Sequence, residues 1–237
     1  MDEKKIKVIV LSDTHGELLD IKEKFDLMLI CGDVCPAHDH YYSFQEEWIK
    51  NDYCDWINSL PFNDDNSKVV MIGGNHDFFL ERAKKQDIER LTQKTNNRLV
   101  MLKNELYEFE GLKIFGTPYC KRFGNWAFNL SDDALRTKYA QCPENVDIII
   151  SHDSPTINGL GEITQGWQFG KNVGNVVLDE LIERVKPKWF FSGHIHSGNH
   201  DISEYGVTKM ANVSIKDEDY IPIYQPLMIE VYKESAT

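Results

Sequence analysis

The sequence lacks several features that mark whole classes of protein. Cysteine is scarce, with 5 residues in 237, and the five form neither C-x-x-C spacing nor a plausible disulfide framework. No apolar run approaches the roughly 20 residues that a membrane-spanning helix needs. The apolar run before Asp13 is also too short for the core of a signal peptide. We therefore expect reduced cysteines in a cytoplasmic protein that has no membrane partner.

Positive charge is also in short supply. The chain has 26 Lys and Arg residues against 38 Asp and Glu, which gives a formal net charge of -12. Proteins that bind extended nucleic acid neutralise phosphates with Lys and Arg, so this balance argues against a general nucleic-acid binder.

Internal repeats, low-complexity tracts and linkers are absent as well. We expect a single domain over residues 1–237.

What is present is an alternation of short apolar runs with longer amphipathic segments, which is typical of α/β proteins. Near-continuous hydrophobicity predicts strands that are buried on both faces. Six such strands are predicted: Ile6–Leu11, Leu27–Cys31, Val69–Ile72, Leu112–Phe115, Val146–Ile150 and Trp189–Phe191. Less regular alternation in the tail predicts two more strands, Val207–Val213 and Leu227–Tyr232.

Three segments have the spacing of helices. Apolar residues recur three or four apart over Phe44–Leu60, where Pro61 ends the pattern, and again over Val177–Val185. A third, more charged helix is predicted over Phe78–Lys94. The glycine-rich stretch Asn158–Gly174 has no periodicity, so we expect a long surface loop that forms a wall of a pocket.

Five of the six buried strands run into groups that can bind a metal ion. In α/β sheets ligands bind outside the carboxyl ends of the strands, so these groups can converge although they are scattered in the sequence. A mixture of imidazole and carboxylate suits Zn, Fe, Mn or Ni, whereas oxygen ligands alone would suggest Mg or Ca. The candidate metal ligands are Asp13, His15, Asp33, Asn75, His152, His194 and His196.

These donors exceed what one ion needs once a position is left open for water. Two ions that share a bridging carboxylate account for the excess. Taken singly, each residue has a structural alternative, because an Asp after a strand usually forms a turn and a lone His is more often a packed residue. Asp77 could in the same way cap the helix that begins at Phe78. The conjunction of five motifs at five strand ends favours the metal site.

In chain order, these motifs resemble those of the calcineurin-like metallophosphoesterase superfamily. The matching segments are Asp13-Thr14-His15, Gly32-Asp33, Gly74-Asn75-His76-Asp77, Ser151-His152 and Gly193-His194-Ile195-His196. A closer resemblance is to the metallophosphoesterase-domain-containing subgroup, studied as cyclic nucleotide phosphodiesterases. Two segments carry it, Gly116-Thr117-Pro118-Tyr119 and Phe123-Gly124-Asn125-Trp126-Ala127-Phe128. The sequence departs from the subgroup at Tyr119, which usually is Trp, and in Ser151-His152-Asp153-Ser154-Pro155, a looser form of its His-Gly-Pro-Pro turn.

The resemblance implies a four-layer αββα sandwich, in which helices flank two mixed sheets packed face to face. It also implies two divalent transition-metal ions, with manganese expected and iron, zinc or nickel as alternatives. One ion would be held by Asp13, His15, Asp33 and His196, and the other by Asp33, Asn75, His152 and His194. Asp33 would thus bridge the two, and a metal-bridging hydroxide would be the nucleophile. His76 would protonate the leaving oxygen, and Asp77 would orient His76.

The predicted function is therefore hydrolysis of a phosphate ester, with a phosphodiester on a small substrate such as a cyclic nucleotide as the first choice. A phosphomonoesterase or a nuclease would suit the same centre, and a non-enzymatic scaffold is disfavoured by the complete ligand set. The oligomeric state is left open. Outside the motifs, His38, His40 and His200 are expected at the surface, with a pocket border as the alternative. Lys121 and Arg122 are expected to be solvated, with phosphate binding as the alternative.

Overall fold

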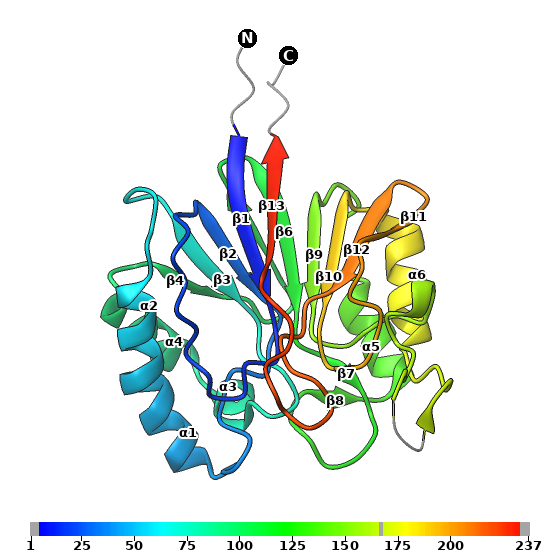
Figure 1. The fold of residues 1–237 in the computed structure, drawn as a ribbon, viewed down its shortest axis with the longest axis horizontal. Helices are drawn as coiled ribbons and strands as arrows, with labels where there is room; N and C mark the ends of the chain where they lie inside the picture. Colours follow the sequence, from blue (N-terminus) through cyan, green and yellow to red (C-terminus); the bar gives the residue numbers. More distant parts are fainter. Residues whose placement is uncertain (1–4, 166–167, 233–237) are drawn as a thin grey trace.

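Two mixed β-sheets lie face to face in the computed structural model of the protein, which describes residues 5–165 and 168–232 (Figure 1). The first sheet has the strand order β13-β1-β2-β3-β4. Its strands are β1 (Lys5–Leu11), β2 (Leu27–Ile30), β3 (Lys68–Met71), β4 (Leu99–Met101) and β13 (Leu227–Tyr232). All neighbours are parallel except β13, which pairs antiparallel with β1.

The second sheet has the strand order β11-β12-β10-β9-β6-β5. Its strands are β5 (Glu105–Phe109), β6 (Leu112–Thr117), β9 (Ile148–Ser151), β10 (Trp189–Ser192), β11 (Ser203–Tyr205) and β12 (Thr208–Asn212). The four central strands are parallel, and β5 and β11 form antiparallel edges. A separate short pair joins β7 (Cys120–Lys121) to β8 (Asn129–Leu130).

Each central strand sends alternate side chains into two different cores, as the two-residue period of a strand requires. In β1, Val8 and Val10 pack between the two sheets, whereas Ile9 packs under the helices. In β9, Ile148 packs between the sheets and Ile149 faces the helices on the opposite side. Both faces of the strands are buried, which is why they read as continuous apolar runs.

Helices cover the outer face of each sheet (Figure 1). The first sheet is covered by α1 (Tyr42–Trp48), the π-helical turn η1 (Ile49–Tyr53), α2 (Cys54–Ser59), α3 (Phe78–Arg82) and α4 (Lys85–Lys94). The second sheet is covered by α5 (Asp132–Tyr139) and α6 (Val176–Val185). The expected fold, a four-layer αββα sandwich of two mixed sheets, is thereby confirmed.

One predicted helix is wrong in its middle. The pattern over Phe78–Lys94 is broken at Ala83, whose ψ of 130° lies outside the helical region. The chain becomes helical again at Lys85, where the Asp87 carboxylate accepts the backbone N–H of Lys84 at 3.0 Å. Local capping therefore restarts the helix after a turn that periodicity does not reveal.

The stretch expected to be a surface loop, residues 158–174, has little regular structure in its described part. It contains the end of the short 3-10 helix η2 (Ile157–Gly159) and one isolated bridge between Glu162 and Asn172.

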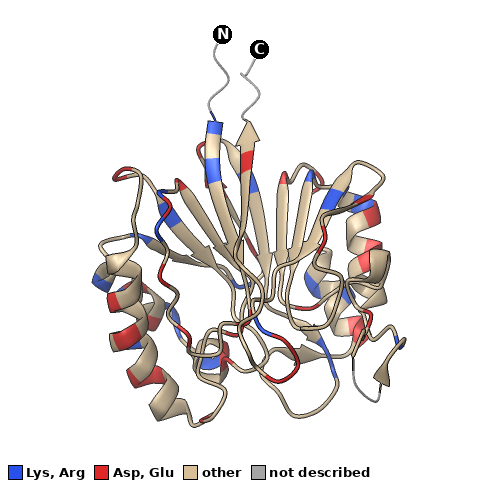
Figure 2. Cartoon of the chain, viewed as in Figure 1, with Lys and Arg blue, Asp and Glu red and all other residues tan. Residues whose placement is uncertain are grey.

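Charged residues gather on the helices and loops, while the central strands carry few (Figure 2). Within residues 5–165 and 168–232, no helix is both long enough and apolar enough to cross a membrane.

Candidate metal centre

The carboxyl ends of five strands meet at one end of the molecule, the lower end in Figure 1. Three of these strands belong to the first sheet and two to the second, so the meeting point lies where the sheets face each other. The residues that follow them are Asp13 and His15 after β1, Asp33 after β2, Asn75 after β3, His152 after β9, and His194 and His196 after β10. The strand ends therefore bring together the residues expected to be ligands.

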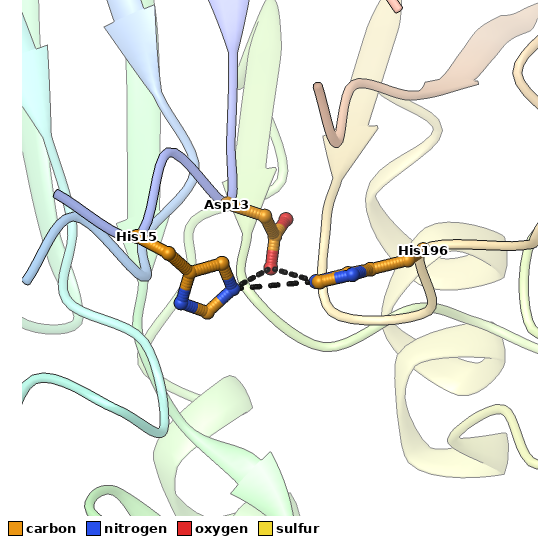
Figure 3. A group of neighbouring side chains, drawn as sticks. All are labelled: Asp13, His15 and His196. Atoms are coloured by element: carbon orange, nitrogen blue, oxygen red, sulfur yellow. Dashed lines mark hydrogen bonds and ion pairs between the residues drawn. The ribbon is translucent and has the colours of Figure 1, made fainter. Parts of the chain in front are cut away.

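Asp13, His15 and His196 form one compact group (Figure 3). Nε2 of His196 lies 3.3 Å from Oδ1 of Asp13 and 3.3 Å from Nε2 of His15. Nε2 of His15 lies 3.9 Å from the same Asp13 oxygen. Three donor atoms thus point at one another from both sheets, which is the arrangement that a metal ion between them requires.

The remaining predicted ligands adjoin this group. Oδ2 of Asp33 lies 3.4 Å from Nε2 of His152 and 3.8 Å from Nε2 of His15. Oδ1 of Asn75 lies 2.9 Å from Nε2 of His152. The ring of His194 is centred 5.2 Å from that of His152. The structure therefore brings all seven predicted ligands to one centre.

Two of the histidines are held in a fixed orientation by backbone carbonyls. Nδ1 of His152 donates to the carbonyl of Cys31, and Nδ1 of His196 donates to the carbonyl of Asp217, each at 2.8 Å. Because a carbonyl can only accept, the proton of the neutral ring must sit on Nδ1, and Nε2 is left as a ligand atom facing the centre. Among the described residues, the buried Nδ1 of His15 has no hydrogen-bond partner. The nitrogen of His15 that faces the candidate metal centre is the other one, Nε2.

The loops that carry the ligands have an unusual backbone. Asp13, His15, Asp33 and His194 all have positive φ angles, of 56°, 46°, 52° and 69°. Non-glycine residues rarely adopt this left-handed region, and such strain gathers at functional sites. The strand-end turns are therefore shaped to present these side chains and not to minimise local energy.

Two glycines allow the backbone to approach the carboxylates. A Cβ atom on Gly74 would lie 2.2 Å from Oδ1 of Asp33, and one on Gly193 would lie 2.2 Å from Oδ2 of Asp13. Both distances are far shorter than any real contact, so no other residue fits without displacing a carboxylate. Glycine at these positions is required by the candidate metal centre itself.

The electrostatics of the centre call for a cation. Burial alone would raise the pKa values of Asp13 and Asp33, yet the neighbouring histidines hold both well below the usual range. Burial likewise would lower the pKa of His152 and His196, but the carboxylates raise these to about 10 and about 9. Without a metal ion, the carboxylates favour protonated, positively charged histidines. A divalent ion would supply that positive charge instead, and the histidines would then bind it as neutral rings. The residues present therefore fit divalent transition-metal ions.

His76 lies beside the centre. Its Nε2 is 4.0 Å from Oδ2 of Asp33, and its backbone N–H donates to Oδ1 of Asp33 at 2.7 Å. Together with His15 and Asp33 it forms a further group of possible ligands, so the geometry also admits His76 as a ligand. Burial lowers the pKa of His76, partly offset by the charge of Asp33.

Asp77 is engaged by the backbone. One carboxylate oxygen accepts the N–H of Gly74 at 2.7 Å and that of Val34 at 3.3 Å, and the other accepts the N–H of Cys35 at 2.9 Å. Its side chain makes no capping bond to α3 within the described residues. Asp77 therefore fastens the loop after β2 to the loop after β3, a role that differs from both the expected orientation of His76 and the capping alternative.

A cavity of about 230 Å³ opens onto the centre. Its lining residues are Asp33, Asn75, His76, Phe123, Trp126, His194, His196, Glu218 and Tyr220. Phe123 and Trp126 belong to a segment that the sequence had already singled out. Glu218 and Tyr220 were missed, because the segment before β13 has no periodicity, and its run of acidic residues reads as an ordinary solvated turn.

The residues outside the motifs divide into two groups. His38 is exposed as expected, whereas His40 is half-buried and its Nε2 lies 2.9 Å from Nδ1 of His76, which fits the alternative of a residue that borders the pocket. His200 is also half-buried, and its Nε2 lies 2.8 Å from the carbonyl of His196. Lys121 and Arg122 are exposed. Lys121 lines a second cavity, of about 550 Å³, which shares Phe123 and His194 with the first.

Comparison with known proteins places these features in a family. Residues 6–198 match the family model described as calcineurin-like phosphoesterase. The human protein named metallophosphoesterase domain-containing protein 1 is 26% identical over 249 residues, which cover 95% of this chain and 71% of that protein. UPF0046 protein T07D4.2 of Caenorhabditis elegans is 26% identical over 256 residues, which cover 95% of this chain and 60% of that protein.

Solved structures share the fold at low sequence identity. Phosphopantetheinyl hydrolase from Mycobacterium tuberculosis aligns with a TM-score of 0.52 and 14% identity over 90% of both chains. The protein TT1561 of Thermus thermophilus aligns with a TM-score of 0.58 and 10% identity, covering 88% of this chain and 89% of that one. These likenesses concern the arrangement of sheets and helices alone.

Proposed function

The chain belongs to the calcineurin-like phosphoesterase family, whose members are metal-dependent hydrolases of phosphate esters, and we propose that it is a phosphodiesterase with a two-metal centre. Its substrate would be small, such as a cyclic nucleotide. The observation that carries the proposal is the convergence of buried carboxylates and imidazoles at the strand ends of both sheets.

The overlap of the ligand groups supports two metal positions. The group of Asp13, His15 and His196 lies on one side, while His152 and Asn75 lie on the other. Oδ2 of Asp33 is near Nε2 of both His15 and His152, so this carboxylate is suited to bridge. Manganese is our choice of metal, with iron, zinc or nickel as alternatives, because the donors mix imidazole with carboxylate.

Each group of the chain has a task in the reaction. When bound, the ions would lower the pKa of a coordinated water to near neutrality and neutralise the phosphoryl oxygens. The backbone N–H of His194 and the hydroxyl of Ser214 hold the Asp13 carboxylate in place, at 3.0 Å and 2.8 Å. His76 presents Nε2 to the cavity, where it would give a proton to the leaving oxygen.

The charge of the cavity favours a diester over a monoester. Within the described part of the chain, its lining residues include the carboxylates of Asp33 and Glu218 and no Lys or Arg. The ions would attract both kinds of ester, but the charge of Glu218 in the cavity wall opposes a monoester dianion more than a diester monoanion. The rings of Phe123, Trp126 and Tyr220 add a surface on which a planar base could stack.

Other activities remain candidates for the same centre. A phosphomonoesterase is disfavoured by the carboxylate of Glu218 in the cavity wall, and a nuclease is disfavoured by the net charge of -12. A scaffold without activity would have no use for a complete ligand set.

We place the protein in the cytoplasm, since all five cysteines are buried thiols in the described chain and none is in a disulfide.

The test is a substrate and metal panel. The chelated protein is expected to be inactive and to regain activity with Mn, Fe, Zn or Ni. The panel contains bis(p-nitrophenyl) phosphate, p-nitrophenyl phosphate, cyclic nucleotides and a single-stranded oligonucleotide. Asp13→Ala should abolish activity, whereas Asp20→Ala, which removes an exposed acid from the loop after β1, should not. Full activity of the metal-free protein would overturn the proposal, and preference for the monoester or the oligonucleotide would select an alternative.

A further inference from the structure

The ring of His76 is held from behind by a second histidine. Nδ1 of His76 lies 2.9 Å from Nε2 of His40, which precedes it by 36 residues. The other ring nitrogen of His76, Nε2, faces the centre 4.0 Å from Oδ2 of Asp33. The carboxylate of Asp77 is occupied by backbone N–H groups of two loops and does not supply this contact. His40 is thus the side chain that meets the rear nitrogen of His76.

An aromatic wall keeps the two rings together. The indole ring of Trp126 is centred 4.5 Å from His76 and 5.3 Å from His40. The ring of Phe78 is centred 5.7 Å from that of His40. Only 8% of His76 is exposed, so few water molecules can reach its rear nitrogen. The hydrogen bond with His40 therefore has little competition from solvent.

The proton arrangement of the acid form follows from simple counting. A histidine that can give up a proton carries N–H groups on both ring nitrogens. The Nδ1–H of that ring can only donate, so Nε2 of His40 must accept it. The proton that is free to leave is then the one on Nε2, which faces the cavity. The contact with His40 decides which nitrogen reacts.

We propose that His40 is a positioning residue, which accepts the Nδ1–H of His76 and thereby directs the transferable proton on Nε2 into the cavity. This inference rests on the proposed function. In the step concerned, the nucleophile is a hydroxide, formed from a water molecule that has released one proton to solvent. Its oxygen forms a bond to phosphorus, the bond from phosphorus to the leaving oxygen breaks, and that leaving oxygen takes the Nε2 proton of His76. His76 is left neutral with its Nδ1–H still bonded to His40, and solvent restores the Nε2 proton.

The kinetic test uses leaving groups that differ in their need for a proton. Aryl diesters are compared from nitrophenol to unsubstituted phenol leaving groups, in wild type, His40→Ala and His40→Gln. His40→Ala should lower kcat for the phenol ester by roughly 10–100-fold, as removal of an orienting partner does, with little change for nitrophenol or in KM. His40→Gln retains an acceptor oxygen and should restore most of the loss. His38→Ala, in the same loop but exposed, is the matched control.

A second readout does not depend on activity. In ¹⁵N-histidine NMR spectra of the zinc-loaded protein, neutral wild-type His76 should carry its proton on Nδ1, and His40→Ala should shift it toward Nε2. A wild-type proton on Nε2 would overturn the proposal, as would equal kinetic losses for all leaving groups. If wild type hydrolyses no ester, the proposed function fails. The loss of kcat in His76→Ala is measured on the same esters. If that loss depends on the leaving group while the loss in His40→Ala does not, the proposed function stands and the role of His40 is wrong.

Discussion

Oδ2 of Asp33 lies 3.4 Å from Nε2 of His152, although Asp33 follows β2 of the first sheet and His152 follows β9 of the second. The same oxygen lies 3.8 Å from Nε2 of His15. One carboxylate therefore reaches both halves of the candidate metal centre, and it is buried there. Anything that alters this carboxylate should be felt at both metal positions.

Replacement of that carboxylate tests the bridge. Asp33→Asn should weaken both metal ions together, because the amide lacks the negative charge that two cations would share. His15→Ala should mainly affect one ion, since His15 belongs to only one side of the centre. Metal analysis after dialysis of each variant gives the stoichiometry. Unchanged occupancy in Asp33→Asn would refute the bridging role.

Gly74 gives a second test, which leaves every predicted ligand in place. In Gly74→Ala the added Cβ would lie 2.2 Å from Oδ1 of Asp33 and 2.4 Å from its backbone nitrogen, so the loop after β2 must move. We expect a loss of turnover on the order of 10²-fold, the cost of a misplaced reacting group. Gly206→Asn, at a turn where nothing lies within 4 Å, is the control and should keep its activity. Equal activity of both variants would show that the close approach is dispensable.

The central strands and the ligands at their ends could be predicted from the sequence because both depend on short-range patterns. A strand buried on both faces is apolar throughout, so Asp13 and Asp33 stand out as the points where such runs stop. Chain topology then does the rest, since parallel strands deliver their carboxyl ends to one edge. The positive φ of these residues, in contrast, has only a weak sequence signal, because Asp adopts the left-handed region more often than most residues do but still uncommonly.

The residues that the sequence did not reveal owe their places to contacts between loops. His40 meets His76 across 36 residues, and no periodicity connects the two loops. From the sequence, Asp77 was expected to cap a helix or to orient His76. The sequence does not show that its carboxylate accepts hydrogen bonds from three backbone N–H groups. The same holds for Asp217, whose carbonyl orients His196 from a loop near the end of the chain.

The role of His76 separates chemistry from metal binding. If it protonates the leaving group, His76→Ala should lose roughly 10²–10⁴-fold in turnover, the usual range for a general acid, and should keep both metals. The loss should shrink for nitrophenolate, which leaves without a proton, and grow for an alkoxide such as a ribose oxygen. Kinetics and metal analysis on one preparation decide the matter. Loss of a metal would make His76 a ligand, which its place beside His15 and Asp33 also allows.

The preference for diesters should depend on Glu218, the exposed carboxylate in the cavity wall. Glu218→Gln removes its charge but keeps an oxygen for the backbone N–H of Ser197, which Glu218 accepts at 3.1 Å. We expect the ratio of monoester to diester hydrolysis to rise roughly two- to five-fold, the size of effect that an exposed charge has in water. High salt should narrow this difference, because it screens exposed charges. Asp219→Asn removes the same charge next to the cavity lining and should leave the ratio nearly unchanged. A ratio that moves equally in both variants would show a general field effect and no selection by Glu218.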